Sequence, residues 1–274
     1  MPAETATGRV QIGPMDMYWE SHGQGGTPLV VVHGGFGLVA LGRNPQVGGM
    51  SGAVIGPLAA NRRVIGLELQ GHGHTAEIDR PFSYEAFGDD IVAALDQLEL
   101  NQADVMGYSL GAGAALRAAI QYPTRVRKLA VVSIPFRREG WFPEVLATMD
   151  QMSSAGFEHM KHTPLYAAYA EVAPDPAGFS ALMDKTGALQ RRHYDWSEDL
   201  ADLRAQTLLI YADADSVPTS HIAEFYELLG GGARDAHWDG SLRSPARLAV
   251  LPGRTHYDIF QAPEVAQVAD RFFD

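Results

Sequence analysis

The sequence contains no cysteine among its 274 residues. Disulfide bonds, thiolate metal sites and a cysteine nucleophile are therefore excluded. Positive charge is also scarce, because 21 lysines and arginines stand against 33 aspartates and glutamates, giving a formal net charge of −12. Lysines and arginines never form a run longer than two residues. Because nucleic acids and anionic membranes bind clustered basic residues, we expect neither as a partner.

Long apolar runs are missing as well. No segment approaches the roughly 18 consecutive apolar residues that a membrane helix needs. The first eight residues carry neither the cationic start nor the apolar stretch of a secretory signal. We therefore expect no membrane association and a cytoplasmic location. The apolar share of 46% is ordinary for a globular protein with a sizeable core.

Short apolar segments rich in β-branched residues alternate with longer helical patterns. This alternation is typical of an α/β fold, with a mainly parallel sheet covered by helices on both faces. The expected strands are 28–33, 63–69, 103–108, 128–134, 207–212 and 246–251, preceded by a hairpin of 8–12 and 17–21. The expected helices are 84–100, with Ser83 as N-cap, then 110–121, 221–229 and a last helix beginning near Pro263.

One stretch breaks this alternation. From about Pro135 to Arg204 the pattern is helical and rich in large apolar residues, with no convincing strand. We interpret it as a helical cap inserted into the α/β unit. The expected organisation is a core of residues 1–135 and 205–274 interrupted by a cap of residues 136–204.

Residues 107–111 read Gly-Tyr-Ser-Leu-Gly and match the nucleophile-elbow pattern G-x-S-x-G. In this pattern the serine occupies a strained turn from a strand into a helix. Glycine is favoured two residues before and after it, because a side chain there would collide with the neighbouring strand and helix. An apolar strand precedes the motif and a helix of small residues follows it. We therefore predict Ser109 as a nucleophile.

A serine hydroxyl needs a base to remove its proton. His256 follows the last expected strand, and loops at the carboxyl ends of parallel strands are where α/β proteins build ligand sites. The imidazole in turn needs an acid to orient it, and both Asp213 and Asp215 follow strand 207–212. We prefer Asp215 because it lies further into its loop and can turn towards His256, with Asp213 as the alternative.

An attacked carbonyl develops negative charge on its oxygen, which fixed N–H groups can stabilise. The backbone N–H of Leu110, directly after the nucleophile, is one expected donor. The second is the N–H of Gly35, in the loop that follows strand 28–33. Together these two groups form the predicted oxyanion hole.

Metals and organic cofactors are not expected. The histidine pairs His72 with His74 and His159 with His162 lack the further ligands, at defined spacing, of a metallohydrolase site. No G-x-G-x-x-G motif follows the first strand, so a nicotinamide or flavin cofactor is not indicated.

Five segments carry a resemblance to a known superfamily: 33–35, 71–73, 107–111, 213–218 and 252–256. On these segments the chain resembles the α/β-hydrolases over nearly its whole length. It is most similar to small cap-bearing serine esterases and cofactor-free haloperoxidase-like hydrolases, and the chain order Ser, Asp, His is that of the superfamily. The resemblance implies an eight-stranded, mostly parallel sheet with the active site at its carboxyl edge beneath the cap. Two departures are the long glycine-rich passage Gly37 to Gly56 and Ala212, where the family commonly has glycine.

The substrate pocket is expected to be apolar. Ligand sites are mostly apolar with few polar groups, and one face of the cap should cover the serine. The predicted pocket residues are Phe36, Tyr108, Trp141, Met149 and Tyr166.

These features together predict a serine hydrolase that cleaves a small or medium carboxylic ester or lactone through an acyl-enzyme on Ser109. A carbon–carbon bond hydrolase or a perhydrolase would use the same three residues. A ligand-binding protein without catalysis is the alternative from another class, because a fold does not fix a function.

Overall fold

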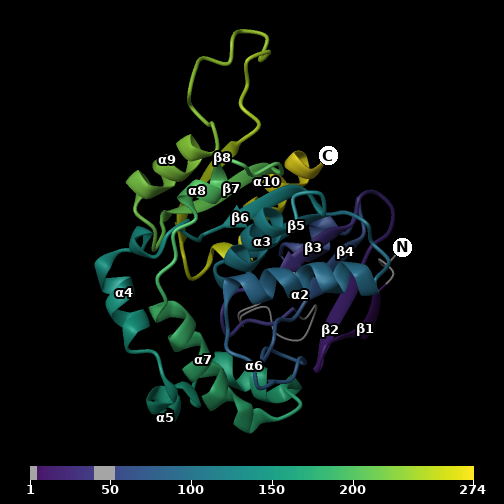
Figure 1. Cartoon of the computed structure of the whole chain (residues 1–274), viewed down its shortest axis with the longest axis vertical. Coiled ribbons are helices and arrows are strands. Elements are labelled where there is room, and N and C mark those ends of the chain that lie inside the picture. The colour runs from purple at the N-terminus through teal and green to yellow at the C-terminus, as the bar shows by residue number, and fades with distance from the viewer. Residues whose placement is uncertain (1–4, 40–52) are drawn as a thin grey trace.

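A computed structural model describes residues 5–39 and 53–274. In this part of the chain eight strands form one sheet, in the order β1-β2-β4-β3-β5-β6-β7-β8 (Figure 1). The pairs β1 with β2 and β2 with β4 are antiparallel, and the remaining pairs are parallel. The predicted eight-stranded, mostly parallel sheet is thereby confirmed. The strands span Thr5–Ile12, Met15–His22, Leu29–Val32, Val64–Leu67, Ala103–Tyr108, Val126–Val132, Gln206–Ala214 and Arg247–Thr255.

Helices cover both faces of the sheet. Successive side chains of a strand point to opposite faces, so apolar side chains on both faces need to be covered. In β3, Val30 and Val32 belong to one core with α2, α3 and α9, while Leu29 and Val31 belong to a second core with α1 and α10. Each buried strand therefore reads as a continuous apolar run. The helices flanking the sheet span Ile55–Leu58 (α1), Tyr84–Gln97 (α2), Leu110–Gln121 (α3), Thr219–Leu228 (α9) and Pro263–Phe273 (α10).

Several element ends differ from the predicted ones by a few residues, and the backbone explains two of them. Strand β6 ends before Ser133 because that residue has a left-handed φ of 55°. Helix α2 ends at Gln97 because Glu99 has a φ of 57°. At its other end α2 has the predicted cap, since the Ser83 side chain accepts a hydrogen bond from the backbone N–H of Ala86.

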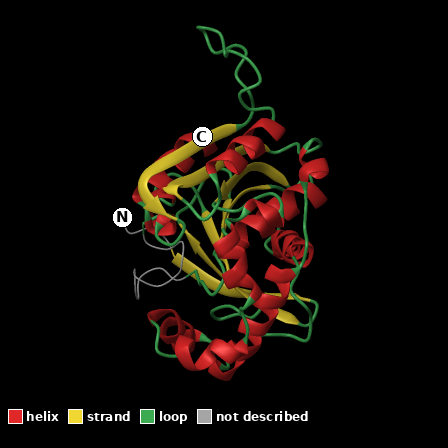
Figure 2. Cartoon of the chain, turned by 90° about the vertical axis from the view of Figure 1, so that its left-hand side faces the viewer, coloured by secondary structure: helices red, strands yellow, loops and turns green. Residues whose placement is uncertain are grey.

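The segment between β6 and β7, residues 133–205, is described throughout and contains five α-helices, three short 3-10 helices and no strand of the sheet. We call it the helical insertion. Figure 2 shows most of it gathered beneath the sheet, at the end away from the long connection between α9 and β8. Its helices span Pro143–Asp150 (α4), Phe157–Met160 (α5), Pro164–Val172 (α6), Phe179–Arg191 (α7) and Ser197–Leu200 (α8). The division into a core and a cap stays a prediction.

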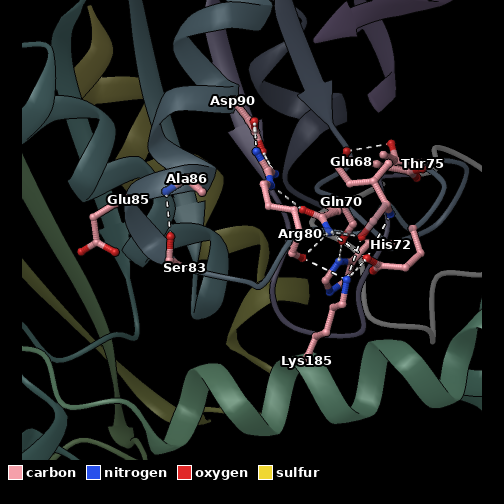
Figure 3. A network of polar contacts seen from close by, with 12 residues as sticks. Glu68, Gln70, His72, Thr75, Arg80, Ser83, Glu85, Ala86, Asp90 and Lys185 are labelled. Carbon is pink, nitrogen blue, oxygen red and sulfur yellow. Dashed lines mark hydrogen bonds and ion pairs between the residues drawn. The ribbon is translucent and has the colours of Figure 1, made fainter. Parts of the chain in front are cut away.

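A polar network fastens the helical insertion to the core. Lys185, on α7, points towards the loop of residues 70–80 that follows β4 (Figure 3). Its ammonium group donates to the Glu77 carboxylate and to the backbone oxygens of Ile78 and Arg80. Arg80 in turn pairs through both terminal nitrogens with the buried Asp90 of α2. The insertion is thus tied to two elements of the core by charged groups.

No described helix has both the length and the apolar composition that crossing a bilayer would require. The glycine-rich passage Gly37 to Gly56 falls largely on residues 40–52, which lie outside the described residues.

Helix α3 approaches β3 so closely that Gly111 has no room for a side chain. A Cβ atom at Gly111 would lie 2.2 Å from the carbonyl oxygen of His33 and 2.6 Å from that of Val32. Both contacts are with backbone atoms, which cannot move aside cheaply. The carboxyl end of β3 and the start of α3 are therefore held in fixed register.

Replacing Gly111 with alanine tests this contact. Glycine to alanine normally stabilises a helix by up to about 1 kcal/mol, but here we expect about 2 kcal/mol or more of destabilisation from overpacking. Urea unfolding followed by circular dichroism measures the change. Gly56→Ala in α1 is the control, because no described atom outside its neighbouring residues and its own helix backbone lies within 4 Å of its Cβ position. Equal stability of the two variants would contradict the packing described.

Candidate active site

Ser109 occupies a strained turn between β5 and α3. Its φ of 51° and ψ of −118° fall where residues other than glycine are rare. The turn is held against β6, since the Ser109 N–H donates to the Val132 oxygen at 2.8 Å. A Cβ at Gly107 would lie 2.2 Å from the Gly111 oxygen, so this glycine too is required by a close approach. The turn directs the hydroxyl away from the sheet, at the amino end of α3.

The structure brings His256 to this hydroxyl from the far end of the chain. The Oγ atom of Ser109 lies 3.2 Å from Nε2 of His256, which directly follows β8. Two aromatic residues hold the imidazole. Tyr108 donates its hydroxyl to the His256 carbonyl oxygen at 2.6 Å, and the Trp141 ring contacts the imidazole edge to face, with centroids 5.4 Å apart. His256 is thus positioned through its backbone and through its ring.

Asp215 lies on the other side of the imidazole. Its Oδ1 atom is 3.3 Å from Nδ1 of His256, and its Oδ2 atom accepts hydrogen bonds from the Ser133 hydroxyl at 2.6 Å and the Ala212 N–H at 3.0 Å. Burial acts to raise the pKa of this carboxyl, but the hydrogen bond and charge of His256, followed by the two other donors, outweigh it. The pKa is therefore lowered, and Asp215 is ionised at neutral pH.

Asp213 faces away from this site. Its side chain is exposed and accepts a long hydrogen bond, 3.3 Å, from the backbone N–H of Arg254. Between the two aspartates that the sequence left open, the structure therefore brings only Asp215 to His256.

The predicted oxyanion donors lie beside the serine. Gly35 and Leu110 both line the pocket that contains Ser109, and a Cβ at Gly35 would be 3.8 Å from the Leu110 side chain. Leu110 begins α3, and the first N–H groups of a helix have no partner within it. Phe36, the next residue of the Gly35 loop, has a φ of 59°, a rare conformation for a bulky residue. This loop therefore has a strained shape next to Ser109.

The buried His33 fixes the base of that loop. Its Nε2 atom accepts the N–H of Leu69 at 3.1 Å, and its Nδ1 lies 2.7 Å from the Gly34 oxygen, to which it donates. Burial, followed by the nearby His72, lowers the pKa of His33 to about 3. Burial likewise lowers the pKa of His72 to about 4. Both rings are therefore neutral at pH 7.

A pocket of about 510 Å³ opens above Ser109, between the carboxyl edge of the sheet and the helical insertion. Four of the five predicted pocket residues line it: Phe36, Tyr108, Trp141 and Met149. None of the described lining residues is an aspartate, glutamate, lysine or arginine. The pocket therefore suits an uncharged ligand, because an unpaired charge is costly to bury.

Tyr166 does not line the pocket, contrary to prediction. Its ring packs edge to face against Phe157 and Phe179, at 5.4 and 5.1 Å, inside the helical insertion. The preceding residues of α6, Pro164 and Leu165, line the pocket instead. Successive helical residues point about 100° apart, so a shift of one position turns a side chain from the pocket to the insertion's own core.

The predicted site residues do not include Ser133, Gln190 and Tyr194, which come from segments with no motif. Ser133 donates a hydrogen bond to Asp215, and Gln190 and Tyr194 line the pocket. The one local signal is the position of Ser133, which directly follows a buried strand in the way that site residues of α/β sheets do. Within residues 5–39 and 53–274, no group of three or more potential metal-ligating side chains is found.

A family model described as the alpha/beta hydrolase fold matches residues 27–163, which is half of the chain and includes Ser109. The chain belongs to the α/β-hydrolase family. This confirms the resemblance drawn from the five motif segments.

Three members of this family show how the chain relates to known proteins. It is 30% identical to the putative carbamate hydrolase RutD of Caulobacter sp. (strain K31), over 67% of this chain and 75% of that protein. It is 36% identical to a 2-hydroxymuconate semialdehyde hydrolase of Pseudomonas sp. (strain CF600), over 39% of this chain. This match and another at 34% identity span only 36% and 32% of the length of those relatives. The crystal structure of an E-2-(acetamidomethylene)succinate hydrolase superimposes with a TM-score of 0.71 at 20% identity, over 99% of this chain and 100% of that one.

Replacing Asp215 with asparagine tests the orientation of His256. An amide in place of the carboxylate favours the wrong imidazole tautomer and removes the charge that stabilises the imidazolium, so serine reactivity should fall by roughly four orders of magnitude. The measurement is the rate at which a fluorophosphonate labels Ser109. Asp213→Asn is the matched control and should label at the rate of the unmodified protein. If Asp213→Asn were the slow variant, Asp213 would be the orienting acid.

The neutral buried histidines predict acid sensitivity. Below about pH 6.5 each is protonated in the unfolded chain but not in the folded protein, so the unfolded state binds more protons. This contribution to stability is complete above pH 6.5 and declines as the pH falls towards about 4 for His72. His72→Gln should reduce the pH dependence of the free energy of unfolding by about 1.4 kcal/mol per pH unit in this window. Urea titrations measure it, with the exposed His193→Gln as control. An unchanged slope in His72→Gln would contradict the buried neutral state.

Proposed function

We propose that this protein is a serine hydrolase that cleaves an uncharged carboxylic ester or lactone through an acyl-enzyme on Ser109. The observation that carries the proposal is the chain of two contacts, 3.2 Å from Ser109 Oγ to His256 and 3.3 Å from His256 to Asp215, in the wall of an apolar pocket. Such spacing allows a proton to pass from the hydroxyl to the imidazole.

In the first half of the reaction, Nε2 of His256 takes the hydroxyl proton while Ser109 Oγ attacks the substrate carbonyl carbon. The carbonyl oxygen becomes an oxyanion and accepts hydrogen bonds from the N–H groups of Gly35 and Leu110. Each such donor lowers the barrier by about 3 kcal/mol. The imidazolium, stabilised by Asp215, then protonates the departing alkoxide as the carbon–oxygen bond breaks.

In the second half, water enters after the alcohol has left. His256 removes a proton from the water as its oxygen attacks the acyl carbon. The bond between that carbon and Ser109 Oγ then breaks, the carboxylic acid leaves, and the imidazolium returns its proton to Oγ, which regenerates the Ser109 hydroxyl. The helical insertion acts as a cap in this proposal, because residues of the insertion such as Trp141 and Met149 line the pocket that contains Ser109. An apolar wall excludes water from the pocket, and electrostatic interactions between the reacting groups are stronger where water is excluded.

Carbon–carbon bond hydrolysis is the second candidate, favoured by the likeness to the 2-hydroxymuconate semialdehyde hydrolase. It would use the same three residues, so substrate profiling must separate the two. The uncharged pocket supports the ester, since anionic substrates would meet no described lysine or arginine in the lining.

The test is hydrolysis of p-nitrophenyl esters of increasing acyl length, with a vinylogous diketone as the competing substrate. We expect ester turnover with a preference for short or medium chains, and a fall of about 10³-fold or more in Ser109→Ala because the nucleophile is gone. Circular dichroism should show Ser109→Ala folded. Faster cleavage of the diketone would favour the second candidate. Absence of both turnover and fluorophosphonate labelling would indicate a binding protein.

A further inference from the structure

Three aromatic rings contact the imidazole of His256. The centroids of the Tyr108, Trp141 and Tyr257 rings each lie 5.4 Å from the imidazole centroid. The Phe260 ring packs on Tyr108, with centroids 5.1 Å apart. All four of these aromatic side chains also line the pocket above the nucleophile. We call Tyr108, Trp141, Tyr257 and Phe260 the aromatic cluster.

The four members of the aromatic cluster differ in how much of their surface the protein covers. Tyr108, Trp141 and Phe260 are buried, but Tyr257 is 71% exposed although it lines the pocket. A lining residue with so much exposed surface lies where the pocket meets solvent. Most of the Tyr257 ring is therefore free to be covered by a ligand, at a position beside His256.

The reaction determines which part of a substrate lies beside His256. In the proposed mechanism Nε2 of His256, 3.2 Å from Ser109 Oγ, protonates the departing alkoxide. The leaving oxygen must then come within hydrogen-bond distance of Nε2, and the carbon group bonded to that oxygen begins next to the imidazole. The rings that contact the imidazole are therefore the pocket residues that the alcohol part of an ester meets first.

The helical insertion lines the pocket with side chains of a different kind. Val145, Thr148 and Met149 of α4 line it, as do Pro164 and Leu165 of α6. None of these five residues is aromatic. Flexible and aliphatic side chains adapt to chains of varied shape, whereas aromatic rings favour other flat rings. The pocket thus presents two chemically different surfaces, and only the aromatic one contacts His256.

We propose that the aromatic cluster binds the alcohol part of the substrate and selects esters of aromatic alcohols, with the acyl part directed towards α4 and α6. This inference rests on the proposed function and narrows its substrate class from uncharged esters in general to esters of an aryl or arylmethyl alcohol. Tyr257 is the specificity-determining member of the cluster, because its ring is the one with surface left for a ligand to cover.

Two acetate esters of similar shape test the assignment: benzyl acetate and cyclohexylmethyl acetate. Both release a primary alcohol, so they differ little in chemical reactivity, and only the first carries an aromatic ring. We expect kcat/KM to favour benzyl acetate about fivefold, which is the effect of one aromatic pair beyond the burial of apolar area. A ratio near one, or a preference for the cyclohexylmethyl ester, would overturn the proposal.

Substitutions at Tyr257 test whether its ring produces the preference. Tyr257→Phe keeps the ring and should keep the ratio, whereas Tyr257→Ala should bring the ratio towards one. Circular dichroism should show both variants folded, because the side chain is largely exposed. Trp238→Ala is the matched control, since Trp238 is an aromatic residue that is 90% exposed and lies outside the pocket lining. An unchanged ratio in Tyr257→Ala, or an equal loss in Trp238→Ala, would overturn the proposal.

A second pair of esters carries the same two rings on the acyl side: methyl phenylacetate and methyl cyclohexylacetate. If the aromatic cluster meets the alcohol part, Tyr257→Ala should change the ratio of kcat/KM values for the acetate pair and not for this pair. An aromatic preference that appears only in the acyl-side pair, and that Tyr257→Ala removes, would place the acyl part at the cluster and overturn the assignment.

A binding measurement separates this inference from the proposed function. Ser109→Ala cannot form an acyl-enzyme, so its affinity for benzyl acetate and cyclohexylmethyl acetate can be measured by NMR titration. We expect benzyl acetate to bind about fivefold more tightly, and Tyr257→Ala in the same background to remove the difference. If the difference holds while the unmodified protein hydrolyses no ester, the proposed function is wrong and the aromatic cluster stands as a binding site. If esters are hydrolysed but neither turnover nor binding distinguishes the acetate pair, this inference is wrong and the proposed function stands.

Discussion

The close contact between the end of β3 and the start of α3 is the constraint on which the site depends. Gly111 allows the backbone of α3 to meet the backbone at the end of β3, and Gly107 in β5 allows the close approach of Gly111, so the chain between the two glycines must turn sharply. Ser109 takes the strain of that turn with a φ of 51°. Strain of this kind persists only where the surrounding structure fixes it. The same contact sets the start of α3 beside the Gly35 loop, and these two segments carry the N–H groups of the proposed oxyanion hole.

The geometry of the site depends, secondly, on the buried side chain of Asp215, whose charged form is stabilised by hydrogen bonds. A carboxylate out of contact with water would hold its proton unless donors favoured the ionised form. Asp215 has three partners, the His256 ring, the Ser133 hydroxyl and the Ala212 N–H, and their combined effect lowers its pKa. Two of these donors occupy Oδ2 and leave Oδ1 for the imidazole. The geometry of the base therefore depends on residues from three different strand ends.

The pocket is built from two parts of the chain, the sheet and the helical insertion. Elements of the sheet carry the groups that would react, while the insertion supplies much of the apolar wall and also the lining residues Gln190 and Tyr194. Lys185 anchors the insertion to the loop of residues 70–80 through a charged group and two backbone oxygens. In families built on a common sheet, function changes with such inserted segments rather than with the fold. Substrate choice in this protein is proposed to follow the same division.

The sequence by itself determined the α/β fold, the positions of the parallel strands to within a few residues, and Ser109, His256 and an aspartate after β7 as the residues to bring together. Those signals are local, because strand runs, helix periods and the elbow glycines are read from consecutive residues. Only the tertiary structure chose Asp215 over Asp213, joined Ser133 to it, directed Tyr166 into the insertion and left Gln190 and Tyr194 in the pocket wall. These outcomes depend on which way side chains point between elements far apart in the chain, and packing, not local pattern, decides that.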